Sequence, residues 1–234
     1  MANTKRIALV VGVGPGLGAA TARRLHADGF RVAVASRDAN RLTDLAQEID
    51  GLALSIDATD PASVRAGIES VEEALGPIHT VVWNVGGGVF GTLESVDTDG
   101  LDLAIGTNTR GLFVLAKRLV PRMAERGDGN LIITGATASI RGKPFTTAFA
   151  AGKAAQRSLA QSLAREWGKQ GVHVALVIVD GMVDLPNTRA RMPDRDTAEF
   201  LSPDGFAETV SFLIGQPRSA WTFELDLRPH LEDW

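Results

Sequence analysis

The sequence predicts an α/β fold in which one doubly wound parallel sheet of about seven strands spans residues 1–234 as a single domain. Short apolar runs alternate with helical stretches along the whole chain, joined by connections of a few residues. Most of these runs are continuously apolar, as is typical of parallel strands that are buried on both faces. Together these observations favour repeated strand–helix units over an all-helical or all-β architecture.

We expect the strands at seven apolar runs, which are Ile7–Val11, Arg31–Ser36, Leu52–Ile56, Thr80–Trp83, Leu131–Thr134, Val172–Val179 and Phe223–Leu227. Between the first two, Leu17, Thr21 and Leu25 recur at helical spacing. Asp60 followed by Pro61 predicts an N-cap and the first turn of a helix after the third strand. The least regular segment, residues 180–203, is rich in Pro, Arg and Asp. It is expected to be either a mobile lid over a site or a solvated loop.

Composition excludes several classes of function. A net charge of −4 provides no electrostatic surface for nucleic acid or an anionic membrane, and no apolar run approaches the ~18 residues that span a bilayer. The N-terminus leads directly into the first strand, so we expect no signal peptide and a cytoplasmic location. The chain has no cysteine, and its four histidines lack metal-ligand spacing, so no metal is expected.

A glycine-rich turn follows the first predicted strand. Gly12, Gly14, Gly16 and Gly18 allow a tight turn, and Leu17 begins the helix that follows. Such a turn brings backbone N–H groups close to a pyrophosphate, and the helix N-terminus favours negative charge. The turn therefore predicts a dinucleotide site, although a purely structural glycine turn is the alternative.

With this turn, the chain resembles the short-chain dehydrogenase/reductase family over nearly its whole length. Gly12, Gly16 and Gly18 match the glycines of the family's T-G-x3-G-x-G turn, with Val11 in place of the threonine. The resemblance implies a Rossmann-type fold and a nicotinamide cofactor.

Further matches follow the third and fourth strands. The resemblance implies that Asp57, followed by Ala58, contacts the adenine amino group, and that Asn84 and Gly86 pack beside the adenosine side of the cofactor. Gly181 and Val183, after the sixth strand, are expected to contact the cofactor as well. Asp57 as a helix cap is the plainer alternative.

Two residues match the family's catalytic tetrad. Asn108 corresponds to its Asn, which can bend its helix and order a water, and Lys153 to the Lys that holds the nicotinamide ribose. The plainer alternatives are a satisfied polar residue and a solvated charge.

The other two tetrad groups are absent. Phe149 stands four residues before Lys153, where the family has Tyr, and the chain contains no tyrosine. Ala136 occupies the Ser position, 13 residues before Phe149. Thr137 or Ser139 can place a hydroxyl nearby, but such a group is a poor proton donor near neutral pH.

The second strand bears on the choice of cofactor. Ser36 and Arg37 end it, and the guanidinium can pair with a 2′-phosphate, so NADP is expected and NAD is less favoured. Arg41 can assist. Against this, Pro15 stands where many NADP users carry a basic residue, and Asp38 can pair with Arg37.

The sequence therefore predicts an NADP(H)-binding oxidoreductase with a degenerate tetrad that reduces an enoyl or activated carbonyl substrate, a small molecule. The chain most resembles family members that carry Phe at the Tyr position. The alternative is a non-catalytic NADP-binding protein that acts as a partner or nucleotide-sensing subunit. Asp180, in place of the family's Pro, is a candidate acid. Otherwise it caps the next turn or pairs with an arginine of residues 189–195.

The helix over residues 149–167 predicts self-association. Its small residues Ala151, Ala155, Ser158 and Ser162 share one face, which would let a second helix approach closely. We expect a homodimer or homotetramer, with packing inside the subunit as the alternative.

Overall fold

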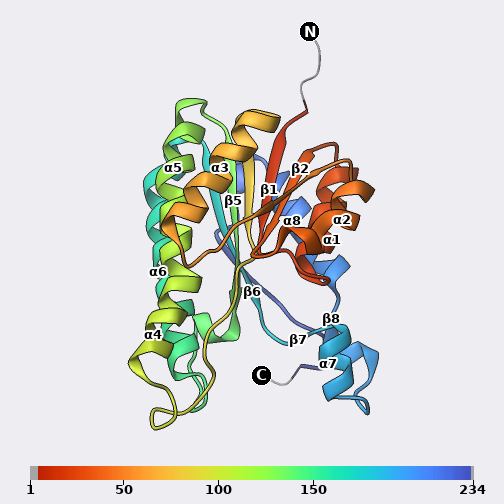
Figure 1. Cartoon of the computed structure of the whole chain (residues 1–234), viewed down its shortest axis with the longest axis vertical. Helices are drawn as coiled ribbons and strands as arrows, with labels where there is room; N and C mark the ends of the chain where they lie inside the picture. Colours follow the sequence, from red (N-terminus) through yellow and green to blue (C-terminus); the bar gives the residue numbers. More distant parts are fainter. Residues whose placement is uncertain (1–4, 233–234) are drawn as a thin grey trace.

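The computed structural model describes residues 5–232, and its centre is a seven-stranded sheet in the order β3-β2-β1-β4-β5-β6-β9 (Figure 1). Every neighbouring pair is parallel. The predicted doubly wound Rossmann-type fold is confirmed. The strands are β1 (Ile7–Val11), β2 (Arg31–Ser36), β3 (Leu52–Ser55), β4 (Ile78–Trp83), β5 (Gly129–Ala136), β6 (Val172–Val179) and β9 (Glu224–Leu227).

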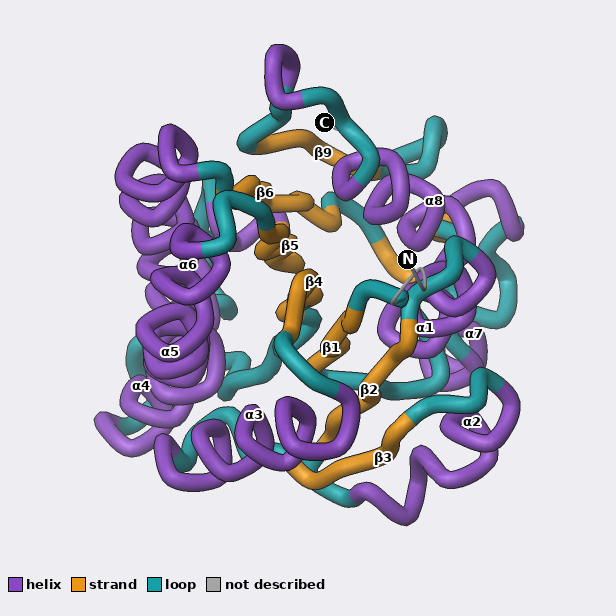
Figure 2. Tube along the Cα trace, turned by 90° about the horizontal axis from the view of Figure 1, so that it is seen from above, coloured by secondary structure: helices purple, strands orange, loops and turns teal. Residues whose placement is uncertain are grey.

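Helices cover both faces of the sheet (Figure 2). One layer contains α3 (Pro61–Leu75), α4 (Thr98–Ile105), α5 (Gly111–Glu125) and α6 (Thr147–Trp167), and the other contains α1 (Leu17–Ala27), α2 (Thr43–Glu48), α7 (Pro186–Arg191) and α8 (Pro203–Ile214). Strand β1 shows why its run is continuously apolar. Leu9 and Val11 enter the core under one layer, and Ala8 and Val10 enter the core under the other.

Two strands are longer than expected. β5 extends from Gly129 to Ala136 instead of Leu131–Thr134, because it pairs with β6 along its full length. β4 begins at Ile78, which pairs with β1. Glycine and alanine have weak strand preference, so neighbour pairing sets the ends of β5.

The segment over residues 180–203 is largely regular structure rather than a loop. β7 (Met182–Val183) and β8 (Phe200–Leu201) form a small parallel sheet, with α7 between them. Arg189 holds the segment together through two hydrogen bonds of 2.7 and 2.9 Å to the Asp184 carboxylate. In Figure 1 this segment lies at the lower end of the molecule, opposite α4.

The small-residue face of α6 is open to solvent. Ala151, Ser158 and Ser162 are exposed and Ala155 is half-buried, so this face is not packed inside the subunit. No helix within residues 5–232 has the length and apolar character needed to cross a membrane.

Candidate functional site

A cavity of about 580 Å³ opens beside the carboxyl ends of β1, β4, β5 and β6. β1 and β4 are neighbours at the point where the strand order reverses, which is where open α/β sheets bind ligands. The Gly12–Gly18 turn, residues 84–86, the end of β5, part of α6 and residues 179–185 all contribute to the lining.

The glycine turn is shaped by close approach of backbone. Gly12 has φ of +86°, and a Cβ there would lie 2.6 Å from the Asn84 carbonyl oxygen. A Cβ on Gly18 would lie 2.8 Å from the Val13 Cα. α1 then begins at Leu17 with no side-chain cap and no acidic residue in its first turn. The free N–H groups of this helix end face a cavity, which fits a pyrophosphate group.

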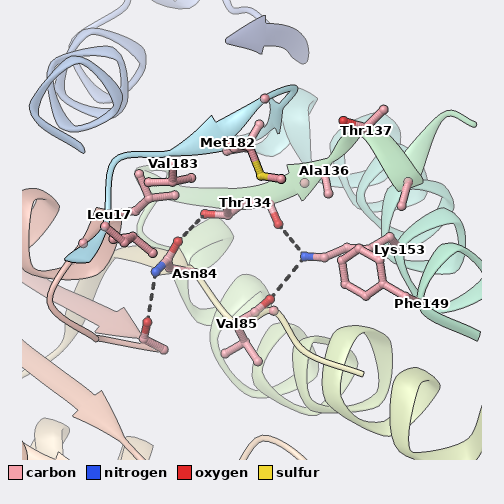
Figure 3. A pocket seen from close by; sticks show the side chains of 18 of the residues that line it. Leu17, Asn84, Val85, Thr134, Ala136, Thr137, Phe149, Lys153, Met182 and Val183 are labelled. Atoms are coloured by element: carbon pink, nitrogen blue, oxygen red, sulfur yellow. Dashed lines mark hydrogen bonds between the residues drawn. The ribbon is translucent and has the colours of Figure 1, made fainter. Parts of the chain in front are cut away.

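Asn84 joins three strands beneath that turn. Its Nδ2 donates to the Gly12 carbonyl at 2.9 Å, and its Oδ1 accepts from Thr134 Oγ1 at 3.0 Å (Figure 3). The side chain therefore fixes the end of β1 to β5, and Gly86 lines the cavity just beyond it.

The predicted cofactor contacts after β6 are at the cavity. Gly181 and Val183 both line it. Sequence reasoning missed Leu185, whose side chain packs where a Cβ of Gly16 would stand. Its place in the same irregular segment was the only signal.

Lys153 is 2% exposed and lines the cavity, so the alternative of a solvated charge is wrong. Its ammonium donates to the Thr134 carbonyl at 2.9 Å, to Gln156 Oε1 at 3.1 Å and to the Val85 carbonyl at 3.3 Å. Burial lowers the pKa of Lys153 to about 7. All three donors thus have protein partners, whereas the family resemblance assigned them to a ribose.

Asn108 lies in a π-helical turn, η2 (Gly106–Arg110), between α4 and α5. Its Nδ2 donates to the Gly87 carbonyl at 2.6 Å and the Ala104 carbonyl at 2.8 Å, as expected for a residue that bends its helix. Its Oδ1 is buried and has no partner among the described residues. Asn108 does not itself line the cavity.

Gln156 connects Lys153 to Asn108, and sequence reasoning did not identify it. Its Nε2 donates to the Asn108 carbonyl at 2.8 Å while its Oε1 accepts from Lys153. The signal was available, because residues three apart on a helix share a face. The amide therefore links Lys153 to the π-helical turn.

Phe149 and Ala136 stand where the sequence placed them, and both line the cavity. In Figure 3, Phe149 and Lys153 project from α6 toward the same space. The Phe149 ring contacts Phe90, with 4.7 Å between centroids.

Of the two candidate hydroxyls, Thr137 lines the cavity and donates to Asp180 at 2.5 Å. Ser139 is 4% exposed, and its Oγ accepts a hydrogen bond from the Ala136 backbone N–H at 3.0 Å. Only Thr137 therefore brings a hydroxyl to the cavity wall.

Asp180 is 5% exposed and does not pair with residues 189–195, so that alternative is wrong. Arg228 contacts its carboxylate at 3.2 Å and Arg141 at 3.4 Å. Arg189 instead pairs with Asp184, and Arg195 with Glu199.

The adenine-side residues lie outside the cavity, beyond the ends of β2 and β3. Ser36 Oγ donates to the Asp38 carbonyl at 2.8 Å. Arg37 is exposed and makes no ion pair within residues 5–232, since Asp38 instead accepts from the Asn40 N–H at 3.1 Å. The guanidinium remains available to an anion.

Asp57 is followed by Ala58, a buried residue under α5. Asp57 Oδ1 accepts from the Thr59 hydroxyl at 2.7 Å and the Thr59 N–H at 2.8 Å, and these bonds lower the pKa of Asp57. α3 is capped by Asp60, so Asp57 is not the helix cap. Residues 5–232 hold no cluster of acids and histidines placed to bind a metal ion.

Comparison with known proteins identifies the family. A family model described as short chain dehydrogenase matches residues 6–196. The chain belongs to the short-chain dehydrogenase family. An uncharacterised oxidoreductase from Staphylococcus aureus is 30% identical over 230 residues, covering 97% of this chain and 98% of the relative.

Solved structures agree with this assignment. A short-chain dehydrogenase from Rhodopseudomonas palustris is 31% identical with a TM-score of 0.83, covering 96% of this chain and 99% of that one. An alcohol dehydrogenase from Thermococcus sibiricus, complexed with 5-hydroxy-NADP, is 26% identical with a TM-score of 0.87, covering 98% of each chain. A metagenomic short-chain oxidoreductase in complex with NADP is 27% identical with a TM-score of 0.83, covering 97% of this chain and 98% of that one.

Proposed function

We propose that this short-chain dehydrogenase is an NADP(H)-dependent oxidoreductase that reduces an enoyl or activated carbonyl substrate without a tyrosine acid. The observation that carries this proposal is Phe149, which lines the cavity one helical turn before Lys153. A phenyl ring cannot donate a proton to a developing alkoxide. The chain would thus belong to the subgroup with Phe in place of Tyr.

The missing donor limits the chemistry. Bound NADPH would supply a hydride. Reducing an unactivated ketone also needs a proton at the carbonyl oxygen, and a positioned acid contributes typically ~10²–10⁴-fold there. At a conjugated C=C bond the hydride adds to carbon, and the enolate oxygen needs only hydrogen-bond or cationic stabilisation. Among the groups at the cavity, Lys153 and the Thr137 hydroxyl lie on the side of Phe149 and Ala136 and are the candidates to provide it.

The cofactor preference rests on Arg37. Its exposed guanidinium has no ion-pair partner within residues 5–232 and follows β2, at the position where the family distinguishes the two cofactors. Two of the structural relatives at 26–27% identity carry NADP or a derivative of it. Asp57, Ala58 and Gly86 would hold the adenosine side, and Gly181 and Val183 the opposite end.

One observation favours the alternative, an NADP-binding protein without turnover. Lys153 already donates to three protein oxygens, and Thr137 donates to Asp180. If these bonds persist in the cofactor complex, Lys153 keeps no donor for a ribose or an enolate.

Residues 180–203 would act as a lid. The segment meets the cavity at Gly181–Leu185, and Leu185 packs over Gly16 in the phosphate-binding turn. A group bound at that turn would have to displace the Leu185 side chain, so binding would move the segment.

An assay of substrate scope tests the proposal. We would follow NADPH oxidation with 2-cyclohexenone and with cyclohexanone, which share a ring and differ in conjugation. The proposal predicts turnover of the enone and negligible turnover of the saturated ketone. Tight NADPH binding with turnover of neither ketone would favour the non-catalytic alternative, and equal turnover of both would contradict the absence of an acid.

Self-association would use the exposed small-residue face of α6. Because Ala151, Ser158 and Ser162 face solvent, a second α6 can approach closely there. We expect a dimer or tetramer by light scattering at micromolar concentration. Ser158→Arg should shift the population to monomer, whereas Lys169→Glu, beyond the end of α6, should not; a monomeric native chain would contradict this expectation.

A further inference from the structure

We propose that the substrate end of the cavity takes a small molecule with a flat apolar body and an anionic group, and that Lys143 recognises the anion. This inference rests on the proposed function and narrows its substrate class. The substrate end is here the part lined by residues 137–149, Phe90 and Met182.

The apolar body follows from side chains that are exposed and yet line the cavity. Phe90 is 57% exposed, Phe145 55% and Met182 42%, and they come from two loops and from β7. Phe90 also contacts the Phe149 ring. Large apolar groups that meet around one opening mark a site for an apolar ligand, whose burial would remove this surface from water.

The anionic group follows from the charges of the lining. Two exposed cations, Arg141 and Lys143, line the cavity together with the buried Lys153 amine, and no Asp or Glu within residues 5–232 does so. The chain as a whole carries a net charge of −4. A cationic cavity in an acidic protein concentrates anions locally.

Lys143 is the cation of this set that remains available. Arg141 contacts the Asp180 carboxylate at 3.4 Å, and Lys153 donates to three oxygens. The Lys143 ammonium has no partner within residues 5–232.

The loop that carries Lys143 is well held. The Lys143 N–H donates to Thr146 Oγ1 at 2.8 Å, and this hydroxyl donates to the Lys143 carbonyl at 3.0 Å. The Gly91 N–H donates to the Phe145 carbonyl at 2.7 Å, joining the loop to the one that carries Phe90. These bonds hold the backbone that carries Lys143 and Phe145 beside the backbone of the Phe90 loop.

Lys143 belongs to the substrate end rather than to the phosphate-binding turn. Figure 3 places Leu17 on one side of the cavity and Thr137 and Phe149 on the other. Lys143 lies in the short connection between those last two residues. An anion at Lys143 would thus be separate from the cofactor phosphates.

A titration with paired probes tests this inference. trans-Cinnamate and trans-cinnamamide share a flat conjugated body and differ in charge, and NADP⁺ at saturation prevents turnover. By calorimetry we expect cinnamate to bind roughly fivefold more tightly than the amide, as one accessible charge pair allows. Lys143→Ala should abolish the preference, while Lys169→Ala, an exposed lysine away from the cavity, should retain it. Phe145→Ala should weaken both probes about equally.

Three results would overturn the inference. They are equal binding of the two probes to the native chain, no binding of either, and a Lys143→Ala variant that loses NADP⁺ affinity instead of the charge preference. The same titration without NADP⁺ separates this inference from the proposed function. A chain that prefers cinnamate but binds no NADP⁺ would contradict the function and support the inference.

Discussion

The two ends of the cavity are built in different ways. At the cofactor end, main chain defines the shape: Gly12 turns with positive φ against the Asn84 carbonyl, and α1 presents an uncapped N-terminus. At the substrate end, side chains define it. In the proposed function, Phe149 at this end and Ala136 beside it take the place of two groups on which the family's acid–base chemistry depends.

Because of this difference, cofactor binding and proton donation depend on separate parts of the cavity. Backbone geometry at the cofactor end tolerates few substitutions, because a Cβ would collide with neighbouring main chain. Side chains at the substrate end can change without disturbing the sheet beneath them. In the proposed function, this chain keeps its cofactor site although its proton donor is lost.

The largest effect is expected from a substitution that disturbs the backbone of the cofactor end. Gly12→Ala places a Cβ 2.6 Å from the Asn84 carbonyl oxygen at φ of +86°. We expect a loss of about 3 kcal/mol in the free energy of unfolding and at least ~100-fold weaker NADPH binding. Denaturant unfolding and fluorescence titration measure the two quantities.

Gly14→Ala is the matched control. A Cβ there would meet nothing within 4 Å, and Gly14 does not have positive φ. Its free energy of unfolding should stay within about 0.5 kcal/mol of the native value. Equal stability of the two variants would contradict the main-chain account of this turn.

Much of the fold and of the cofactor end was predictable from sequence, because apolar periodicity and glycine spacing are local signals. The strands found at Ile7–Val11 and Arg31–Ser36 have the predicted bounds. β5 is longer than predicted because its pairing with β6 extends from Gly129 to Ala136. Such pairing depends on a distant segment.

The partners of charged groups were less predictable. Asp180 pairs with Arg141 and Arg228, which are remote in sequence and meet it only in the folded chain. Of the three oxygens around Lys153, only that of Gln156 lies at helical spacing from it; the other two come from β5 and from the residues after β4, and only the folded chain brings them to Lys153. The two short strands within residues 180–203 were not predicted, because their pairing is also non-local.

Lys153 joins the two ends, and its burial predicts a pH dependence of stability. In the unfolded chain its pKa is near ~10.4, and in the folded chain it falls to about 7. Between these values the unfolded state binds the extra proton, so the free energy of unfolding rises with pH. We expect a gain of about 2 kcal/mol from pH 7 to pH 9 in the native chain.

Lys153→Met should remove most of that gain. The pKa values of His79 and His173 are lowered by burial, so these groups titrate below this window and do not obscure it. Chemical denaturation at both pH values makes the measurement. A native chain whose stability is unchanged from pH 7 to pH 9 would mean that Lys153 stays protonated when buried.

A smaller effect is expected in the preference for NADPH over NADH. We expect NADPH to bind at least tenfold more tightly than NADH, which is ~1.4 kcal/mol, and Arg37→Ala to remove this preference. Lys169→Ala should leave it unchanged, because that residue lies at the far end of α6. Equal affinities in the native chain would contradict the role given to Arg37.

The central claim is that the site lacks a proton donor for ketone reduction, and restoring the donor tests it most directly. Phe149→Tyr adds a phenol one turn before Lys153, and Ala136→Ser adds a hydroxyl at the end of β5. We predict that the double variant reduces cyclohexanone with NADPH about fivefold faster than the native chain, a modest part of the ~10²–10⁴-fold that a well-placed acid contributes. Efficient cyclohexanone reduction by the native chain, with no gain in the double variant, would contradict the claim.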